Sequence, residues 1–190
     1  MKVLYIGGTG TISAACVAES VRQGMEVHVL NRGRTARRPL PPGVTRVVAD
    51  VAEPGSVRAA LAGNEYDSVV DFLSFTAADA TVAVDLLAGH CGQYVHISSA
   101  SVYHKPVRRV PFVESTTRHN PYLRYARDKI AAEDALRRAY DERGFPVTIV
   151  RPSHTYDDAH PPLPGEWAAW HRVARGDELC VPGDGTSCGR

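Results

Sequence analysis

The sequence has few cysteines and no closely spaced cysteine pair. Its four cysteines, Cys16, Cys91, Cys180 and Cys188, are scattered along 190 residues. Structural zinc sites and disulfide frameworks need closely spaced ligands or matched partners. The sequence therefore argues against both, and we expect four reduced thiols in a cytoplasmic protein.

The sequence also lacks an excess of either charge and any long apolar run. Lys and Arg number 22 and Asp and Glu 21, so the formal net charge is +1. This balance argues against nucleic acid or an anionic membrane as a partner, although a local basic patch is compatible with it. The first apolar stretch, residues 1–6, is too short for a signal peptide or a transmembrane helix.

Apolar runs that alternate with amphipathic segments fill most of the chain. We predict strands at 2–6, 27–30, 44–49, 68–72, 94–98 and 147–150, and helices at 11–23, 54–61, 77–87, 122–143 and 166–175. Alternating strands and helices predict one parallel sheet with right-handed crossovers. The expected fold class is α/β, with helices on both faces of the sheet.

A glycine-rich segment lies between the first predicted strand and the first predicted helix. At this place backbone amides at a helix N-terminus can approach a pyrophosphate. The candidate cofactor contacts are Gly7, Gly8, Thr9, Gly10, Thr11 and Ile12. Ser13 follows at the position where glycine or alanine normally lets the helix pack closely on the sheet.

The second predicted strand is not followed by the acidic residue that would hydrogen-bond the adenosine ribose of NAD. Asn31, Arg32 and Arg34 stand there instead, with Arg37 and Arg38 close behind. An arginine can make charge-assisted contacts with the 2′-phosphate of NADP. We predict NADP as the cofactor and NAD as the alternative, and a solvated basic loop is the other interpretation of these arginines.

Tyr125 and Lys129 are four residues apart on the predicted helix 122–143, so their side chains project from one face. A tyrosine with a pKa near 10 is a poor base at neutral pH, and a neighbouring ammonium favours the phenolate. Such a pair can move a proton at a carbinol while a nicotinamide exchanges the hydride.

Together these motifs resemble the extended short-chain dehydrogenase/reductase family, the NAD-dependent epimerase/dehydratase group. The resemblance rests on Gly-Gly-Thr-Gly-Thr-Ile at 7–12, Asp-Val at 50–51, Val-Val-Asp-Phe-Leu-Ser at 69–74, Ser-Ser-Ala-Ser-Val-Tyr at 98–103, Tyr-Ala-Arg-Asp-Lys at 125–129 and Arg-Pro-Ser at 151–153. Asn-Arg-Gly-Arg at 31–34 and Pro-Gly-Asp-Gly at 182–185 are most similar to atypical members related to chloroplast stem-loop RNA-binding proteins.

The resemblance implies roles for further residues. Asp50 and Val51 would lie by the adenine, Phe72, Leu73 and Ser74 would border the cofactor ribose, and Pro152 and Ser153 would lie near the nicotinamide. Ser99 would hydrogen-bond the substrate oxygen, with Ser98 and Ser101 as close competitors, and would complete a catalytic set with Tyr125 and Lys129. Tyr125 and Lys129 would also contact the cofactor.

The resemblance further divides the chain. Residues 1–155 would form an NAD(P)-binding Rossmann domain, and residues 156–190 would begin a substrate-binding region that continues in other members. We therefore expect a truncated product or a fragment. Residues 154 and 160 are histidines without partners at ligand spacing, so we expect no metal site.

Two functions of different class fit the sequence. The first is an NADP-preferring oxidoreductase or epimerase/dehydratase that acts on a hydroxyl or keto group, with a nucleotide sugar as one candidate substrate. The second is a non-catalytic nucleotide- or RNA-binding protein that uses its arginines on phosphates. The intact Ser99, Tyr125 and Lys129 set favours the first. The resemblance also suggests a homodimer that pairs through the helix carrying Tyr125.

Overall fold

The computed structural model describes residues 1–34, 38–162 and 165–180. The strands of this part are β1 (Lys2–Ile6), β2 (Glu26–Asn31), β3 (Thr45–Val48), β4 (Ser68–Asp71), β5 (Tyr94–Ile97) and β6 (Val147–Val150). The helices are α1 (Thr11–Arg22), α2 (Pro54–Leu61), α3 (Ala77–Leu87), η1 (Ala100–Val102, a short 3₁₀ turn), α4 (Arg124–Arg143) and α5 (Glu166–Ala174). Apart from η1, which was not predicted, each boundary lies within two residues of the predicted one.

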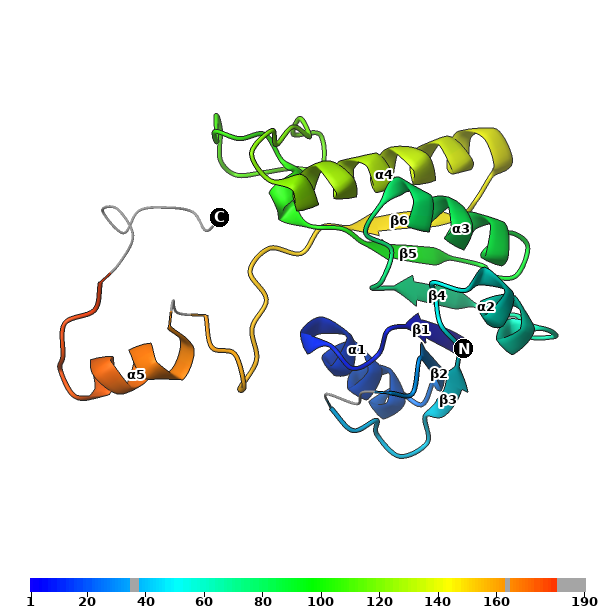
Figure 1. Cartoon of the computed structure of the whole chain (residues 1–190), viewed down its shortest axis with the longest axis horizontal. Helices are drawn as coiled ribbons and strands as arrows, with labels where there is room; N and C mark the ends of the chain where they lie inside the picture. The colour runs from blue at the N-terminus through cyan, green and yellow to red at the C-terminus, as the bar shows by residue number, and fades with distance from the viewer. Residues whose placement is uncertain (35–37, 163–164, 181–190) are drawn as a thin grey trace. The chain divides into compact units, whose positions relative to one another are not determined.

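All six strands pair in parallel, in the order β3-β2-β1-β4-β5-β6 (Figure 1). This is the strand order of a Rossmann fold, and it reverses between β1 and β4. Ligands of open α/β sheets bind outside the carboxyl ends of the strands at such a reversal. The predicted fold class is confirmed, and the topology directs attention to the ends of β1 and β4.

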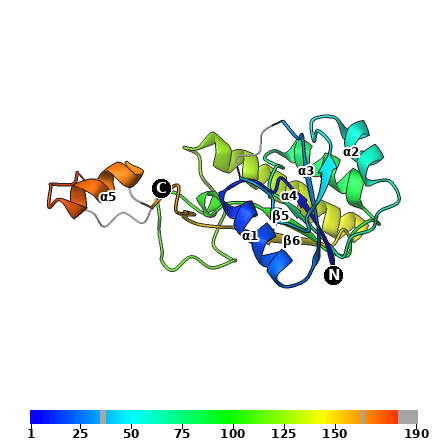
Figure 2. The same ribbon diagram turned by 90° about the horizontal axis from the view of Figure 1, so that it is seen from below.

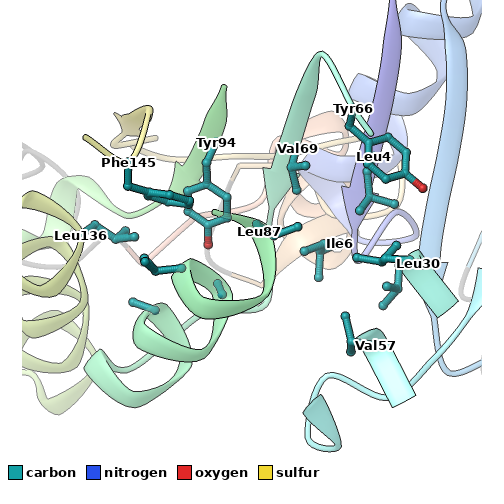
Figure 3. Packing of buried hydrophobic residues seen from close by; sticks show 14 of the residues in the cluster. Leu4, Ile6, Leu30, Val57, Tyr66, Val69, Leu87, Tyr94, Leu136 and Phe145 are labelled. Carbon is teal, nitrogen blue, oxygen red and sulfur yellow. The ribbon is translucent and has the colours of Figure 1, made fainter. Parts of the chain in front are cut away.

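Helices cover both faces of the sheet. Figures 1 and 2 show α2, α3 and α4 on one face and α1 on the other. The larger core lies under α2, α3 and α4 and buries side chains such as Leu4, Val69, Leu87 and Tyr94 (Figure 3). Each large apolar side chain buried there stabilises the fold by about 1.5–3 kcal/mol. The smaller core under α1 includes Val17 and strand residues opposite it.

The start of α4 is set by the side chain of Asn120. Its Oδ1 accepts hydrogen bonds from the backbone amides of Tyr122 (3.2 Å) and Leu123 (3.3 Å). Because these two residues form a turn held by a side chain, helical hydrogen bonding begins at Arg124 rather than at the predicted Tyr122. This turn fixes the first residues of the helix that carries Tyr125.

The chain divides into two compact units, Met1–Pro152 and Ser153–Arg190. The described part of the second unit contains α5, where the Trp167 indole donates to the Asp158 carbonyl at 2.8 Å. The interpretation of residues 156–190 as the start of a substrate-binding region stays a prediction. No helix within residues 1–34, 38–162 and 165–180 is long and apolar enough to cross a membrane.

Candidate functional site

The glycine-rich loop between β1 and α1 is shaped by close backbone contacts. Gly7 has a φ of +83°, a left-handed conformation that other residues rarely adopt. A Cβ on Gly8 would lie 2.6 Å from Cγ1 of Val29 on the neighbouring strand β2. Glycine is therefore required at both positions for the chain to turn from β1 directly into α1.

The first turn of α1 presents backbone amides to a potential anion. Gly10 is the N-cap residue, and no acidic side chain lies in the first turn. The first amides of a helix have no partner within it, and the helix dipole favours negative charge at this end. Buried Ser13 accepts a hydrogen bond from the Gly10 amide through its Oγ at 2.8 Å, which explains how a serine fits here.

A pocket of about 350 Å³ opens beside this loop. It is lined by Gly7, Thr9, Leu30, Asn31, Arg32, Gly33, Arg34, Ala49, Asp50, Val51, Ala52, Leu73 and Phe75. The side chain of Asn31 accepts from the Gly33 amide at 3.0 Å, and that of Asp50 accepts from the Ala52 amide at 3.1 Å. These bonds shape the two loops of the pocket, whose exposed arginines are Arg32 and Arg34. Residue 37, also suggested by the sequence, lies outside the described residues.

A second, more apolar cavity of about 270 Å³ lies between α2 and α3 and shares Val51, Ala52 and Leu73 with the first pocket. The loops after β3 and β4 therefore meet at these three residues. Ser74 lines this cavity as well. Phe72 instead packs in the smaller core, with its ring 6.3 Å from that of Tyr5.

Asp71, at the end of β4, organises the loop that follows it. The carboxylate is buried and accepts four hydrogen bonds: Oδ1 from the amides of Leu73 (2.7 Å) and Ser74 (3.0 Å), and Oδ2 from the hydroxyls of Ser74 (2.7 Å) and Tyr94 (2.8 Å). Charge-assisted bonds of this kind are among the stronger ones in proteins. Sequence reasoning missed this role, although an acidic residue that ends an apolar strand is a usable signal.

Lys129 lies on the inner face of α4 and is 1% exposed. Its Nζ donates to the carbonyl oxygens of Ser74 at 2.7 Å and Ile97 at 2.8 Å, so the ammonium joins the loop after β4 to the end of β5. Burial lowers the pKa of Lys129 to about 8, while the carboxylates of Asp71, Asp79 and Glu133 act in the opposite direction. The side chain is therefore still mostly charged at neutral pH.

Tyr125 lies one turn before Lys129 and is 40% exposed. Burial raises the pKa of Tyr125, and a hydrogen bond with the Ser99 side chain lowers it less strongly. The sequence led us to expect a pKa lowered by Lys129. The structure differs because the Lys129 ammonium is directed to the carbonyls of Ser74 and Ile97.

The structure separates the three serines near the end of β5. Ser99 caps η1, accepts from the Ser101 amide at 3.1 Å and faces Tyr125. Ser98 is buried and donates to Glu133 Oε1 at 2.6 Å, and the Ser101 hydroxyl is buried. Of the three hydroxyls, that of Ser99 is therefore the one beside the Tyr125 phenol.

Glu133 is fully buried one further turn along α4. It accepts hydrogen bonds from Arg151 at 2.7 and 2.9 Å and from Arg118 at 3.1 Å. Burial alone would raise the pKa of Glu133, but the bonds from Arg151 and Ser98 and the nearby arginine charges outweigh it and lower the pKa. Sequence reasoning missed Glu133, although its spacing of four from Lys129 puts both on one helix face.

The residues after β6 were expected near the nicotinamide. The Pro152 carbonyl accepts from the Ala100 amide at 2.9 Å, so Pro152 lies beside η1. Ser153 is exposed and begins the second unit. In the part of the chain that the structure describes, no group of three or more His, Cys, Asp or Glu side chains could hold a metal ion.

Residues 3–187 match the model of the NAD dependent epimerase/dehydratase family. The chain belongs to this family. The resemblance drawn from the motifs is thereby confirmed.

Relatives of this family member include 2'-dehydrokanamycin reductase of Streptomyces kanamyceticus, 30% identical over 156 residues, which are 82% of this chain and 43% of the reductase. Among solved structures, UDP-glucose 4-epimerase of Thermotoga maritima has a TM-score of 0.79 at 18% identity and is matched over 97% of this chain and 67% of its own. The dTDP-glucose 4,6-dehydratase of Bacillus anthracis has a TM-score of 0.77 at 19% identity, over 97% and 65%. The two structures show the shared fold, and the chain spans less than half of the reductase.

In this member of the family, the structure brings Ser99, Tyr125 and Lys129 together where β4 and β5 end. One neighbour was not predicted. The ring centroid of Phe75 is 4.6 Å from Lys129 Nζ and 6.3 Å from the ring centroid of Tyr125, and Phe75 also lines the pocket beside the glycine loop. Nothing in the local sequence pattern marks this phenylalanine as a site residue.

Proposed function

We propose that the chain binds NADP(H) and, as part of an oxidoreductase or epimerase/dehydratase, serves hydride transfer at a hydroxyl or keto carbon of a sugar. The observation that carries the proposal is the grouping of Ser99, Tyr125 and Lys129 at the same sheet edge as the glycine loop. Ligands of such sheets bind at this edge.

The residues present fit a dinucleotide. The first-turn amides of α1 suit a pyrophosphate, and the pocket of about 350 Å³ beside them suits an adenosine. Arg32 and Arg34 line that pocket, and an acidic partner for a ribose 2′-hydroxyl is lacking among residues 31–34. This chemistry favours a 2′-phosphate, and hence NADP over NAD.

A bound nicotinamide dinucleotide would supply or accept the hydride. In the reducing direction, the Tyr125 phenol would give its proton to the carbonyl oxygen, and the Ser99 hydroxyl would donate a hydrogen bond to the same oxygen. The raised pKa of Tyr125 keeps the phenol protonated in the ligand-free protein, which suits a proton donor. Lys129 would hold the two strand ends in place and contribute its positive charge.

The names of the relatives support a sugar substrate. One is a reductase of 2'-dehydrokanamycin, and two structural neighbours are named for UDP-glucose and dTDP-glucose. We propose that the substrate is a sugar ketone or alcohol, with a nucleotide sugar as one form. Residues 156–190 would begin the region that binds it, and a homodimer through α4 stays a prediction.

A dinucleotide titration tests this function. Followed by nicotinamide emission, the 190-residue chain should bind NADPH more tightly than NADH. Arg32→Ala should weaken NADPH binding about tenfold, the loss of one charge-assisted contact, and leave NADH binding unchanged. Arg138→Ala, an exposed arginine on α4, is the matched control and should change neither.

Tyr125→Phe then separates catalysis from binding. It should retain NADPH binding, while turnover of keto-sugar substrates that the chain reduces should fall about 10²–10⁴-fold. Failure of the wild-type chain to bind either dinucleotide would overturn the proposal and favour a non-catalytic function. Tighter binding of NADH, unaffected by Arg32→Ala, would overturn the preference for NADP.

A further inference from the structure

Phe75 is a large apolar side chain that lies outside the core. It is 44% exposed, and it belongs to neither buried core cluster. The backbone around it is held on both sides: Asp71 accepts from the Ser74 amide at 3.0 Å, and Asp79 accepts from the Phe75 amide at 3.0 Å and the Thr76 amide at 2.9 Å. Two carboxylates therefore hold the backbone from which the Phe75 side chain projects.

The ring that this loop presents touches both halves of the site. Its centroid lies 4.6 Å from Lys129 Nζ and 6.3 Å from the Tyr125 ring centroid. The same residue lines the pocket that contains Gly7 and Arg32. Phe75 therefore lies between the glycine-rich loop and the pair formed by Tyr125 and Lys129.

The donors of Lys129 show what the ring does. An ammonium has three N–H groups, and two of them are used by the carbonyls of Ser74 and Ile97. The third has the face of the Phe75 ring within reach, an attraction expected of a cation near an aromatic ring. Lys129 is 1% exposed while Phe75 is 44% exposed, so the ring is part of the layer between the ammonium and water.

We propose that Phe75 is a positioning residue, an aromatic cap that keeps water from the Lys129 ammonium on the side where the ring lines the pocket beside the glycine-rich loop. The inference rests on the proposed function, because the ligand proposed for that pocket is the dinucleotide. The cap occupies the third N–H direction in the ligand-free protein. A ligand hydroxyl that reaches Lys129 would enter beside the ring.

Charged and titratable groups surround Lys129 on each of the elements that pack against it. They are Asp71 at the end of β4, His96 on β5, Asp79 on α3, and Tyr125 and Glu133 on α4. A substitution at Phe75 replaces none of these side chains, and of them only Tyr125 has a ring contact with Phe75. A change in the Lys129 titration on substitution of Phe75 would therefore report water at the ammonium or the loss of the ring.

The test uses the small number of lysines in the chain. There are three, Lys2, Lys105 and Lys129, so protein labelled with ¹³C at the lysine ε-carbon gives three signals that can be followed by NMR against pH. A Lys2→Arg, Lys105→Arg chain retains a single lysine and assigns Lys129. The signals of the other two lysines serve as internal controls.

The proposed cap predicts different Lys129 titration midpoints for two variants. In Phe75→Ala, water reaches the ammonium, and the titration midpoint of Lys129 should rise from about 8 toward the ordinary 10.5. In Phe75→Leu, apolar cover is kept but the ring is lost, so the midpoint should stay or fall. An unchanged midpoint in Phe75→Ala, or an equal rise in both variants, would overturn the cap.

This titration needs no dinucleotide, so its outcome is separate from that of the proposed function. If the Lys129 midpoint rises in Phe75→Ala but the chain binds no dinucleotide, Phe75 shields Lys129 from water, and its proposed role at the ligand site is wrong. Where NADPH binds, its affinity should weaken as pH rises through the Lys129 pKa, and Phe75→Ala should move that weakening to higher pH. Tyr140→Ala, an exposed aromatic on α4, should leave the profile unchanged.

Discussion

The two halves of the sheet form their parts of the candidate site from different kinds of groups. The half that we propose binds the nucleotide (the nucleotide half, residues 1–62 with α1, β2 and β3) offers two glycines that must be glycine, the first amides of α1, and exposed Arg32 and Arg34. No Asp, Glu, Lys or Arg among its described residues is buried. Dinucleotide binding, as proposed for this half, would therefore rely on backbone amides and exposed arginines.

The half that we propose is catalytic (the catalytic half, with β4, β5, β6, α3 and α4) contains buried ionised side chains instead. Asp71, Lys129 and Glu133 are each no more than 2% exposed, and neutral His96 lies among them at 0%. A buried charge is tolerated when its partners satisfy it, and removal of a partner is costly. In this half the residues that shape the site also stabilise the fold. The free energy of unfolding should therefore be measured for substitutions there as well as ligand binding.

The largest loss of stability should come from Glu133→Ala in the catalytic half. It leaves Arg151, whose side chain is 8% exposed, without its carboxylate, and it removes the acceptor of Ser98. Loss of one partner of a buried ion pair costs about 3–5 kcal/mol, so the free energy of unfolding in urea should fall by that amount.

Asp134→Ala is the matched control for Glu133→Ala. Asp134 is the next residue and also pairs with Arg118, at 2.7 Å, but its side chain is 48% exposed. An exposed pair contributes about 0–1 kcal/mol. If the two variants lost equal stability, the buried network would not be what distinguishes the catalytic half.

The second effect is acid sensitivity caused by His96. Burial lowers the pKa of His96 to about 4, and the Lys129 charge assists, while Asp71 and Glu133 act in the opposite direction. Between pH 6.5 and 4 the unfolded chain binds a proton at this histidine and the folded protein does not. Stability should therefore fall as pH falls through this window, by about 3 kcal/mol in total.

His96→Leu should remove that acid sensitivity. It also removes two ring nitrogens that have no hydrogen-bond partner among the described residues, so stability at pH 7.5 should not decrease. Thermal or urea unfolding at pH 7.5 and pH 5 measures the slope. His90→Ala, at an exposed histidine, should keep the wild-type slope, and the prediction fails if His96→Leu keeps it too.

The nucleotide half was the more predictable of the two from sequence. Its signals are local: glycines between an apolar run and a helix, and a basic pair where an acidic residue was expected. Strand and helix positions followed from apolar periodicity throughout the chain, since parallel strands buried on both faces read as continuous apolar runs. The spacing of Tyr125 and Lys129 was visible for the same reason, because four residues make about one helical turn.

The side-chain positions in the catalytic half depend on contacts between segments far apart in the sequence, so no local sequence pattern predicts them. Lys129 donates to the carbonyl of Ser74, 55 residues away in the chain. That geometry, rather than the spacing to Tyr125, determines where the ammonium points, and it is why the expected lowering of the Tyr125 pKa does not match the structure. Phe75 was missed because its position depends on the loop that Asp71 and Asp79 hold.

The smallest effect returns to the nucleotide half, where Ser13 uses an amide that a phosphate could use. Ser13 Oγ accepts from the Gly10 amide at 2.8 Å, and both are at the start of α1. Ser13→Ala should lower the free energy of unfolding by about 1 kcal/mol through loss of this bond. The freed amide should let NADPH bind as tightly as in wild type or more tightly.

Ser20→Ala is the matched control for Ser13→Ala. Ser20 is another buried serine of α1, and its hydroxyl lies 2.8 Å from that of Tyr5. The Ser20→Ala variant should lose similar stability without a change in NADPH affinity. Weaker NADPH binding by Ser13→Ala alone would show that the hydroxyl itself contacts the ligand, and that side chains as well as backbone bind the phosphates in this half.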